Sequence, residues 1–176
     1  MRRLLFGLLI LTVASLAPAS AQSVQTEDRA TQLLGTWSCE SIRHSLGTWT
    51  FTRNADGSLS MKNLFRTEDG LSGEFDDVYR LDSNSGQWEW TSLQPTRPGF
   101  RESGTAAPWT ADKWIFEGQL TLVAPEDSVN FFPTVTRRLR MVYTTLGDLA
   151  FRREFEYRRE GRWVTDSAST CKRLST

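Results

Sequence analysis

Residues 139–157 read LRMVYTTLGDLAFRREFEY, and within them large side chains recur at every second position on either side of a Leu-Gly-Asp turn signal. The two runs are Leu139-x-Met141-x-Tyr143 and Phe151-x-Arg153-x-Phe155-x-Tyr157. Because successive side chains of a β-strand point to opposite faces, this stretch predicts an antiparallel hairpin with one buried face.

The same period of two recurs along most of the chain. It is seen in Trp49-x-Phe51, Leu59-x-Met61, Phe75-x-Asp77-x-Tyr79, Trp88-x-Trp90 and Trp114-x-Phe116. Ten strands are predicted, near residues 35–44, 48–53, 58–66, 73–81, 87–93, 100–103, 113–122, 134–145, 149–158 and 162–174. This indicates an all-β fold, an antiparallel up-and-down barrel of about 8–10 strands with its aromatic face inside. A short amino-terminal helix over about 27–34, capped by Thr26, is expected to cover one end.

The amino terminus has the features of an export signal. Arg2 and Arg3 precede an apolar run, and small residues follow at positions 19–21. Residues 1–21 are therefore interpreted as a secretory signal peptide, and residues 22–176 as one β-barrel domain that is secreted or periplasmic. The apolar run is too short to cross a bilayer as a helix, and no second apolar span follows it in the sequence. No membrane span is therefore expected after cleavage.

The charge balance excludes one class of partner. Removing residues 1–21 leaves 21 acidic and 19 basic side chains, so no strongly basic face is indicated and nucleic acid is not an expected partner. We expect the protein to be a monomer or a weak dimer. Its expected binding partner is a small apolar molecule.

Two cysteines remain, Cys39 in the first predicted strand and Cys171 in the last. In an exported protein such a pair indicates a disulfide, and a closed barrel makes its first and last strands neighbours. The alternative is two buried thiols. No C-x-x-C motif is present, so a redox-active pair is not indicated.

The run from Leu33 to Trp37, with Gly35-x-Trp37, resembles the Gly-x-Trp signature of lipocalins, which are calycin-type barrels. The resemblance implies that Trp37 closes the base of the barrel and that Arg173, from the last strand, packs across it. Tyr143 through Arg173 also resembles small secreted bacterial domains of this barrel type. Lipocalins have eight strands, and ten would be closer to fatty-acid-binding or nitrobindin-like haem barrels. Those haem barrels use a histidine near the chain end, which is absent here, so no cofactor is expected.

Conventional catalytic and metal-binding patterns are weak. The sole histidine, His44, shares strand parity with polar residues and is expected on the surface or at a strand end, so no metal site is predicted. No Gly-x-Ser-x-Gly turn accompanies it. Glu154 and Glu156 are two apart, but they face arginines of the preceding strand and are interpreted as a solvated charge ladder.

Two charged residues, Asp77 and Arg153, share the parity of the aromatic face. A buried charge is costly unless it is paired, so one interpretation is an interior anchor in which Arg153 meets a ligand oxygen and Asp77 orients it or acts as a base. The other is that each lies at a barrel mouth in water. On the first interpretation, replacing Arg153 by Met should preserve the fold and weaken binding of a ligand with a carboxylate or carbonyl head.

The sequence therefore favours an exported barrel that binds a small, mostly apolar ligand without turnover and has no catalytic residues. The expected ligand-binding residues are Trp49, Phe51, Phe75, Asp77, Tyr79, Trp88, Trp90, Trp114, Phe116, Tyr143, Arg153, Phe155 and Tyr157. Two alternatives stay open. One is an isomerase or cyclase using the same cavity with Asp77 as acid or base, and the other is a filled-core protein that binds partners through its surface or serves a structural role.

Overall fold

A computed structural model describes residues 30–93, 100–107, 109, 112–122 and 135–175 of the chain. Within these ranges ten strands form one closed antiparallel barrel, as the alternating pattern predicted. The strands are β1 (Gly35–Ser41), β2 (Leu46–Arg53), β3 (Leu59–Arg66), β4 (Ser72–Leu81), β5 (Trp88–Leu93), β6 (Phe100–Ala106), β7 (Lys113–Leu122), β8 (Val135–Thr145), β9 (Ala150–Arg159) and β10 (Arg162–Arg173). The signal peptide interpreted at residues 1–21 lies outside the described residues.

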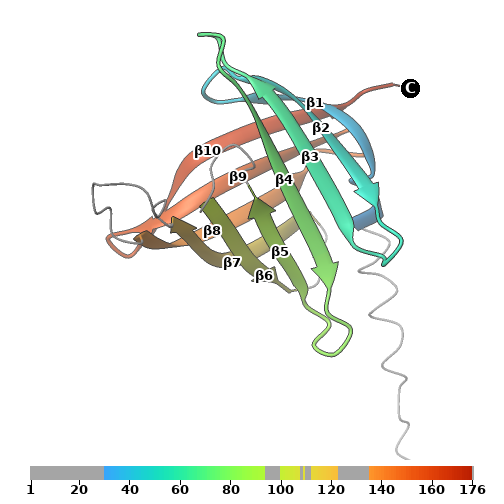
Figure 1. Cartoon of the computed structure of the whole chain (residues 1–176), viewed down its shortest axis with the longest axis vertical. Coiled ribbons are helices and arrows are strands. Elements are labelled where there is room, and N and C mark those ends of the chain that lie inside the picture. The colour runs from blue at the N-terminus through green and yellow to red at the C-terminus, as the bar shows by residue number, and fades with distance from the viewer. Residues whose placement is uncertain (1–29, 94–99, 108, 110–111, 123–134, 176) are drawn as a thin grey trace, which may run out of the picture.

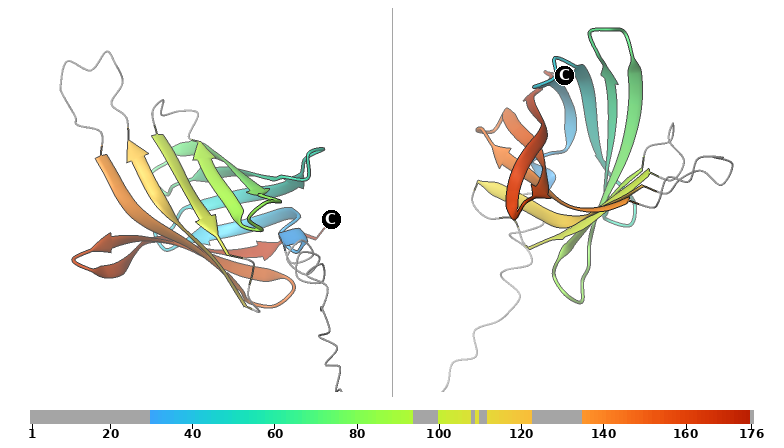
Figure 2. Two further views of the ribbon diagram at one scale, coloured as in Figure 1. Left: turned by 90° about the horizontal axis from the view of Figure 1, so that it is seen from below. Right: turned by 90° about the vertical axis from the view of Figure 1, so that its left-hand side faces the viewer.

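Every strand pairs with its neighbours in the sequence, and β1 pairs with β10 to close the ring. The strands are steeply tilted, so that β8–β10 cross β3–β5 at a large angle (Figures 1 and 2). In Figure 1 the β3–β4 turn lies at the top and the β9–β10 turn on the left, and residues 30–34 lie on the right. We call these the open end and the closed end of the barrel.

Two strand boundaries differ from the sequence-based expectation by three residues. β1 ends at Ser41 rather than His44, because residues 42–45 form a turn in which His44 adopts a positive φ of 58°. β6 extends to Ala106 and is longer than the weak pattern near Phe100 indicated. In β10 a bulge between Thr165 and Ser167 shifts the register against β9.

The predicted disulfide is confirmed. Cys39 and Cys171 are direct partners in the β1–β10 register, with a Cα–Cα distance of 4.0 Å and an S–S distance of 2.05 Å. The bond therefore crosses the seam where the barrel closes, and it joins residues 132 positions apart.

The closed end carries the contacts that the lipocalin resemblance implied. The Trp37 indole Nε1 donates to the Leu33 carbonyl at 2.7 Å, and the Arg173 guanidinium lies 4.2 Å from the Trp37 ring centroid. Arg173 also donates to the carbonyls of Gln32 and Leu34, each at 2.5 Å. The last strand thus holds residues 30–34 over the barrel base.

Only the end of the helix expected over 27–34 falls within the described residues. There, the Leu33 and Leu34 amides donate to the carbonyls of Ala30 and Thr31. Ala30 and Leu33 are buried against the core, as expected for a segment that covers this end. In the described ranges no helix has the length and apolar character needed to cross a membrane.

Aromatic side chains fill the closed half of the barrel. Trp114 lies at the centre of this packing, with its ring 5.2 Å from Trp88, 5.0 Å from Trp109 and 4.6 Å from Phe116. Phe151 contacts Trp37 edge-on at 4.8 Å. This half is solid core, and these rings contribute most of the buried apolar area there.

Two glycines allow β6 and β7 to approach each other beside Trp90. Gly104 and Gly118 are register partners, and a Cβ at Gly118 would overlap the backbone of Ser103. Gly104 in turn pairs with Trp90. The absence of side chains at these positions lets the backbones of β6 and β7 approach each other closely.

The disulfide generates a stability prediction. Replacing Cys39 and Cys171 together by Ala removes a cross-link over 132 residues, so we expect unfolding to become easier by up to about 5 kcal/mol on the chain-entropy model. Urea unfolding followed by tryptophan fluorescence measures this change. Stability equal to that of the parent protein would show that the cross-link does not restrict the unfolded chain.

Candidate functional site

One ion pair crosses the inside of the barrel. Arg153 Nη2 on β9 lies 3.0 Å from Asp77 Oδ2 on β4, and the side chains are 6% and 0% exposed. In the ring of ten strands, β4 and β9 are five places apart in both directions. The pair therefore connects opposite walls, and both sequence-predicted charges do face inward.

A pair of tyrosines extends this connection. The Tyr79 hydroxyl donates to Asp77 Oδ2 at 3.1 Å, and the hydroxyls of Tyr79 and Tyr143 are 2.6 Å apart. Since Tyr79 uses its proton on the carboxylate, Tyr143 is the donor between the two phenols. Burial raises the pKa of Tyr143 to about 12 and raises the pKa of Tyr79 well above its usual value, so both phenols stay protonated.

Aromatic rings enclose the Arg153 guanidinium. Its Cζ lies 4.8 Å from the ring centroid of Trp49, 5.7 Å from that of Tyr143 and 4.4 Å from that of Phe155. Burial by itself lowers the pKa of Arg153, but the nearby Tyr143 and Asp77 more than offset this and raise it overall. The guanidinium is therefore a fixed positive charge held by rings and one carboxylate.

A cavity of about 710 Å³ occupies the open half of the barrel. Five aromatic side chains line it together with ten polar or charged ones, and the charged residues include the buried Arg153 and Glu102. Its lining residues are Arg43, Trp49, Asn63, Phe65, Thr67, Leu71, Ser72, Gly73, Phe75, Ser92, Glu102, Arg153, Phe155, Tyr157, Asp166, Ser167, Ala168 and Ser169. The volume lies within the range of about 300–1,000 Å³ typical of small-molecule sites.

The buried polar atoms at this cavity are not all paired. Among the described residues, Arg153 Nε and Asn63 Oδ1 are buried without a hydrogen-bond partner, and both residues line the cavity. Arg153 Nε is a donor and Asn63 Oδ1 is an acceptor. Both atoms are enclosed by neighbouring groups, so unsatisfied hydrogen-bonding capacity of both kinds lies next to the cavity.

Glu102 is the other buried charged group that lines the cavity, and it is only 5% exposed. The Tyr157 hydroxyl donates to Glu102 Oε1 over a long 3.4 Å. Burial, together with repulsion from Asp77, raises the pKa of Glu102 from an ordinary 4.5 to about 7, while Arg153 and Tyr157 oppose the shift. Near neutral pH this carboxyl group is a mixture of its two protonation states.

The expected ligand-binding residues divide between cavity and core. Those that line the cavity are Trp49, Phe75, Arg153, Phe155 and Tyr157. Those buried outside its lining are Phe51, Asp77, Tyr79, Trp88, Trp90, Trp114, Phe116 and Tyr143. The two-residue alternation correctly placed all of these side chains inside the barrel. It does not tell how far along the barrel axis each side chain lies.

Sequence reasoning missed Glu102, Ser92, Asn63 and Phe65. Ser92 continues the inward parity of Trp88 and Trp90, and Phe65 continues that of Leu59 and Met61, so an extended parity count would have found both. Glu102 gave a weaker signal, because its strand alternates a charged residue with glycine and alanine instead of large apolar side chains.

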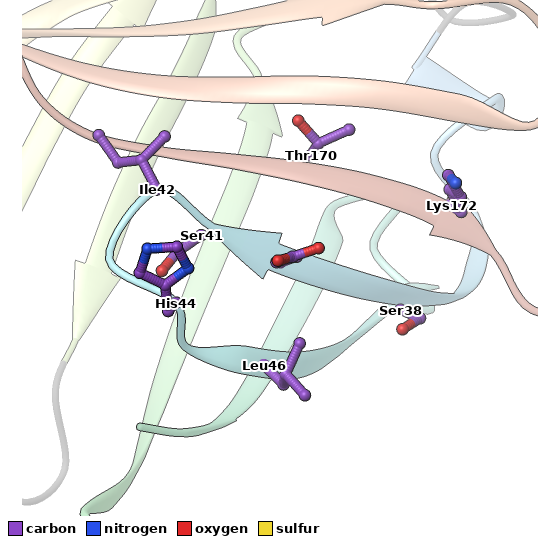
Figure 3. Close-up of a pocket in the computed structure, with 8 residues that line it drawn as sticks. Ser38, Ser41, Ile42, His44, Leu46, Thr170 and Lys172 are labelled. Carbon is purple, nitrogen blue, oxygen red and sulfur yellow. The ribbon is translucent and has the colours of Figure 1, made fainter. Parts of the chain in front are cut away.

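A shallower groove lies on the outer surface around the β1–β2 turn and β10. Figure 3 shows His44 and Leu46 near the turn, with Thr170 and Lys172 on β10. His44 is exposed there, as expected from its parity. In the part of the chain that the structure describes, no group of three or more His, Cys, Asp or Glu is placed to hold a metal ion.

The outer charge ladder is confirmed for Glu156, which lies 2.6 Å from Arg140 as a register partner. Glu154 faces Val142 instead of an arginine, and it pairs with Arg152 at 3.1 Å. Both glutamates belong to the outer face and lie outside the cavity.

The closed ten-stranded antiparallel barrel fits a calycin-like or lipocalin-like fold. No protein-family model matches the chain, and no curated protein matches it. Among solved structures it is similar to one described as EF1p2_mFAP2b bound to DFHBI. That similarity has 11% identity and a TM-score of 0.41, and it covers 85% of this chain and 99% of the other. It is too distant to bear on function.

The Arg153–Asp77 pair changes the outcome expected for Arg153→Met. Without the guanidinium, the fully enclosed Asp77 carboxylate loses its counter-charge, so we expect a loss of about 3–5 kcal/mol in urea unfolding. The double variant Asp77→Asn/Arg153→Met removes both charges and keeps an acceptor for Tyr79, so it should recover most of that loss. A double variant no more stable than Arg153→Met would contradict the coupling.

The raised pKa of Glu102 predicts a pH-dependent stability difference. The folded state holds the proton more tightly than the unfolded chain, so this stability is present below pH 4.5 and is lost as the pH rises to about 7. Relative to Glu102→Gln, the parent protein should lose about 3 kcal/mol over this window. Unfolding curves of both proteins at pH 4.5 and 8 measure the change, and a constant difference would contradict it.

Proposed function

We propose that this protein is an exported barrel that reversibly binds a small, mostly apolar molecule in the cavity at its open end. The observation that carries the proposal is the cavity of about 710 Å³. Aromatic side chains line its walls, and the buried charged residues Arg153 and Glu102 form its inner end, which we call the floor. In small-molecule sites aromatic side chains supply affinity and polar groups fix orientation, and this cavity has both kinds of group.

The geometry supports one orientation of the ligand. The apolar body contacts Trp49, Phe75 and Phe155 on the walls, and a polar head reaches the floor at Arg153. Arg153 lines the cavity, and its guanidinium supplies donors for an acceptor oxygen of that head. Because Arg153 is already fixed by Asp77, binding costs little side-chain entropy there.

Export is part of the proposal. The Cys39–Cys171 disulfide favours an oxidising compartment, since such bonds persist mainly outside the cytosol. Together with the signal-like features of residues 1–21, it supports a secreted or periplasmic location.

Two observations favour binding over the alternatives. Asp77 is fully enclosed and its Oδ2 is engaged by Arg153 and Tyr79, which disfavours its use as the acid or base of an isomerase or cyclase. The open half of the interior disfavours a filled core acting only through its outer surface.

A cavity-filling variant tests the proposal. Ser169 on β10 points into the cavity, whereas the adjacent Thr170 points to the outer surface. We expect Ser169→Trp to reduce binding of a naphthalene-bodied ligand at least tenfold, and Thr170→Trp, as a matched control, to leave it unchanged. Isothermal titration calorimetry measures both, and circular dichroism checks that both variants keep the barrel.

Native mass spectrometry of protein purified gently from its own host provides the second readout. A co-purifying small molecule present with the Thr170→Trp control and lost with Ser169→Trp would place that molecule in the cavity. Equal ligand binding by the two variants would contradict the proposed site.

A further inference from the structure

We propose that the ligand of this cavity is a carboxylic acid, and that its carboxyl group shares a proton with Glu102 while accepting a hydrogen bond from Arg153. This inference rests on the proposed function, because it names the head group of the molecule that the cavity binds.

Glu102 and the ion pair lie at one level of the barrel. In the sheet register Ser92 is the partner of both Asp77 and Glu102, so β5 separates the two acids by two strand spacings of about 4.8 Å each. All three residues point inward. Arg153 reaches this level from the opposite wall through its contact with Asp77. One small head group at the floor therefore lies between Glu102 and Arg153.

The charges around Glu102 come from three elements. Asp77 on β4 and Asp166 on β10 are negative, and Arg153 on β9 is positive, with the Tyr157 hydroxyl also contributed by β9. The adjacent strands contribute Ser92 and Leu120, neither of which titrates. Asp77 already neutralises Arg153, and Asp166 is paired with Arg43 and Arg159 at the rim. An ionised Glu102 is therefore the uncompensated charge of the floor.

This balance discriminates between head groups. An ammonium group has no acceptor for the donors of the Arg153 guanidinium, and it would pair with Glu102 only in its ionised form. A carboxylate facing an ionised Glu102 would be repelled, whereas a protonated Glu102 donates to the ligand carboxylate and removes the excess charge. With a pKa of about 7, Glu102 takes this proton from water at neutral pH without large cost. Binding of one carboxylate then takes up as much as one proton, and no covalent bond changes.

Calorimetry with three ligands that share one body tests the inference. The probes are 2-naphthylacetic acid, its primary amide, and the alcohol 2-(2-naphthyl)ethanol, titrated at pH 6 and pH 8. The acid is ionised at both values, so its pH dependence reports on the protein. Because Glu102 goes from mostly protonated to mostly ionised over this interval, we expect the acid to bind about tenfold more weakly at pH 8, with the alcohol changing less.

Proton uptake is the second readout. Titrations of the acid at pH 8 in two buffers of different ionisation enthalpy should show uptake approaching one proton per ligand. In Glu102→Gln, which keeps a donor but cannot ionise, the affinity for the acid should become independent of pH. Glu89→Gln, which changes an outward-facing glutamate of β5, should behave like the parent protein.

The outcomes separate the two proposals. If all three probes bind equally well and without pH dependence, the cavity binds apolar bodies but the carboxylic-acid inference is wrong. Stronger binding of the acid at pH 8 than at pH 6, or unchanged pH dependence in Glu102→Gln, also overturns it. If none of the three probes binds at either pH, the proposed function itself fails.

Discussion

The structure depends on one contact, the ion pair that joins Arg153 to Asp77 across the barrel. A ten-stranded ring is wide enough to leave a void, and a charge enclosed in it needs a partner. By linking β9 to β4, the pair meets that need and fixes the distance between opposite walls. It also divides the interior, with packed aromatic rings on one side and a cavity on the other.

The two halves of the interior use aromatic residues differently. On the closed side Trp88, Trp109 and Trp114 pack against one another, and burying that area stabilises the barrel. On the open side Trp49 and Phe155 contact the guanidinium and leave space beyond it. The same residue types thus act as core below the ion pair and as walls above it, and only their height along the strands decides which.

Sequence reasoning could reach the fold because the barrel depends on local alternation. Period two placed Asp77 and Arg153 inside, and the compartment argument paired Cys39 with Cys171. It also offered Asp77 as one of several inward partners of Arg153, and it could not single Asp77 out, since that contact is set by strand tilt and side-chain length across the ring. Glu102 escaped for a different reason. Its inward neighbour Gly104 must be small because a Cβ there would lie 3.0 Å from the Glu117 carbonyl oxygen on β7, and this glycine interrupts the large-residue pattern that marks the other strands.

The disulfide at the β1–β10 seam also governs how molecules can reach the interior. A sheet rolled into a ring has one junction where its two terminal strands meet, and separating them is the simplest way to unroll it. Here that junction is covalently fastened between Cys39 and Cys171. Every other boundary between strands joins elements that are consecutive in the chain. The barrel wall is therefore closed all the way round, and ligands enter and leave the interior at the rim.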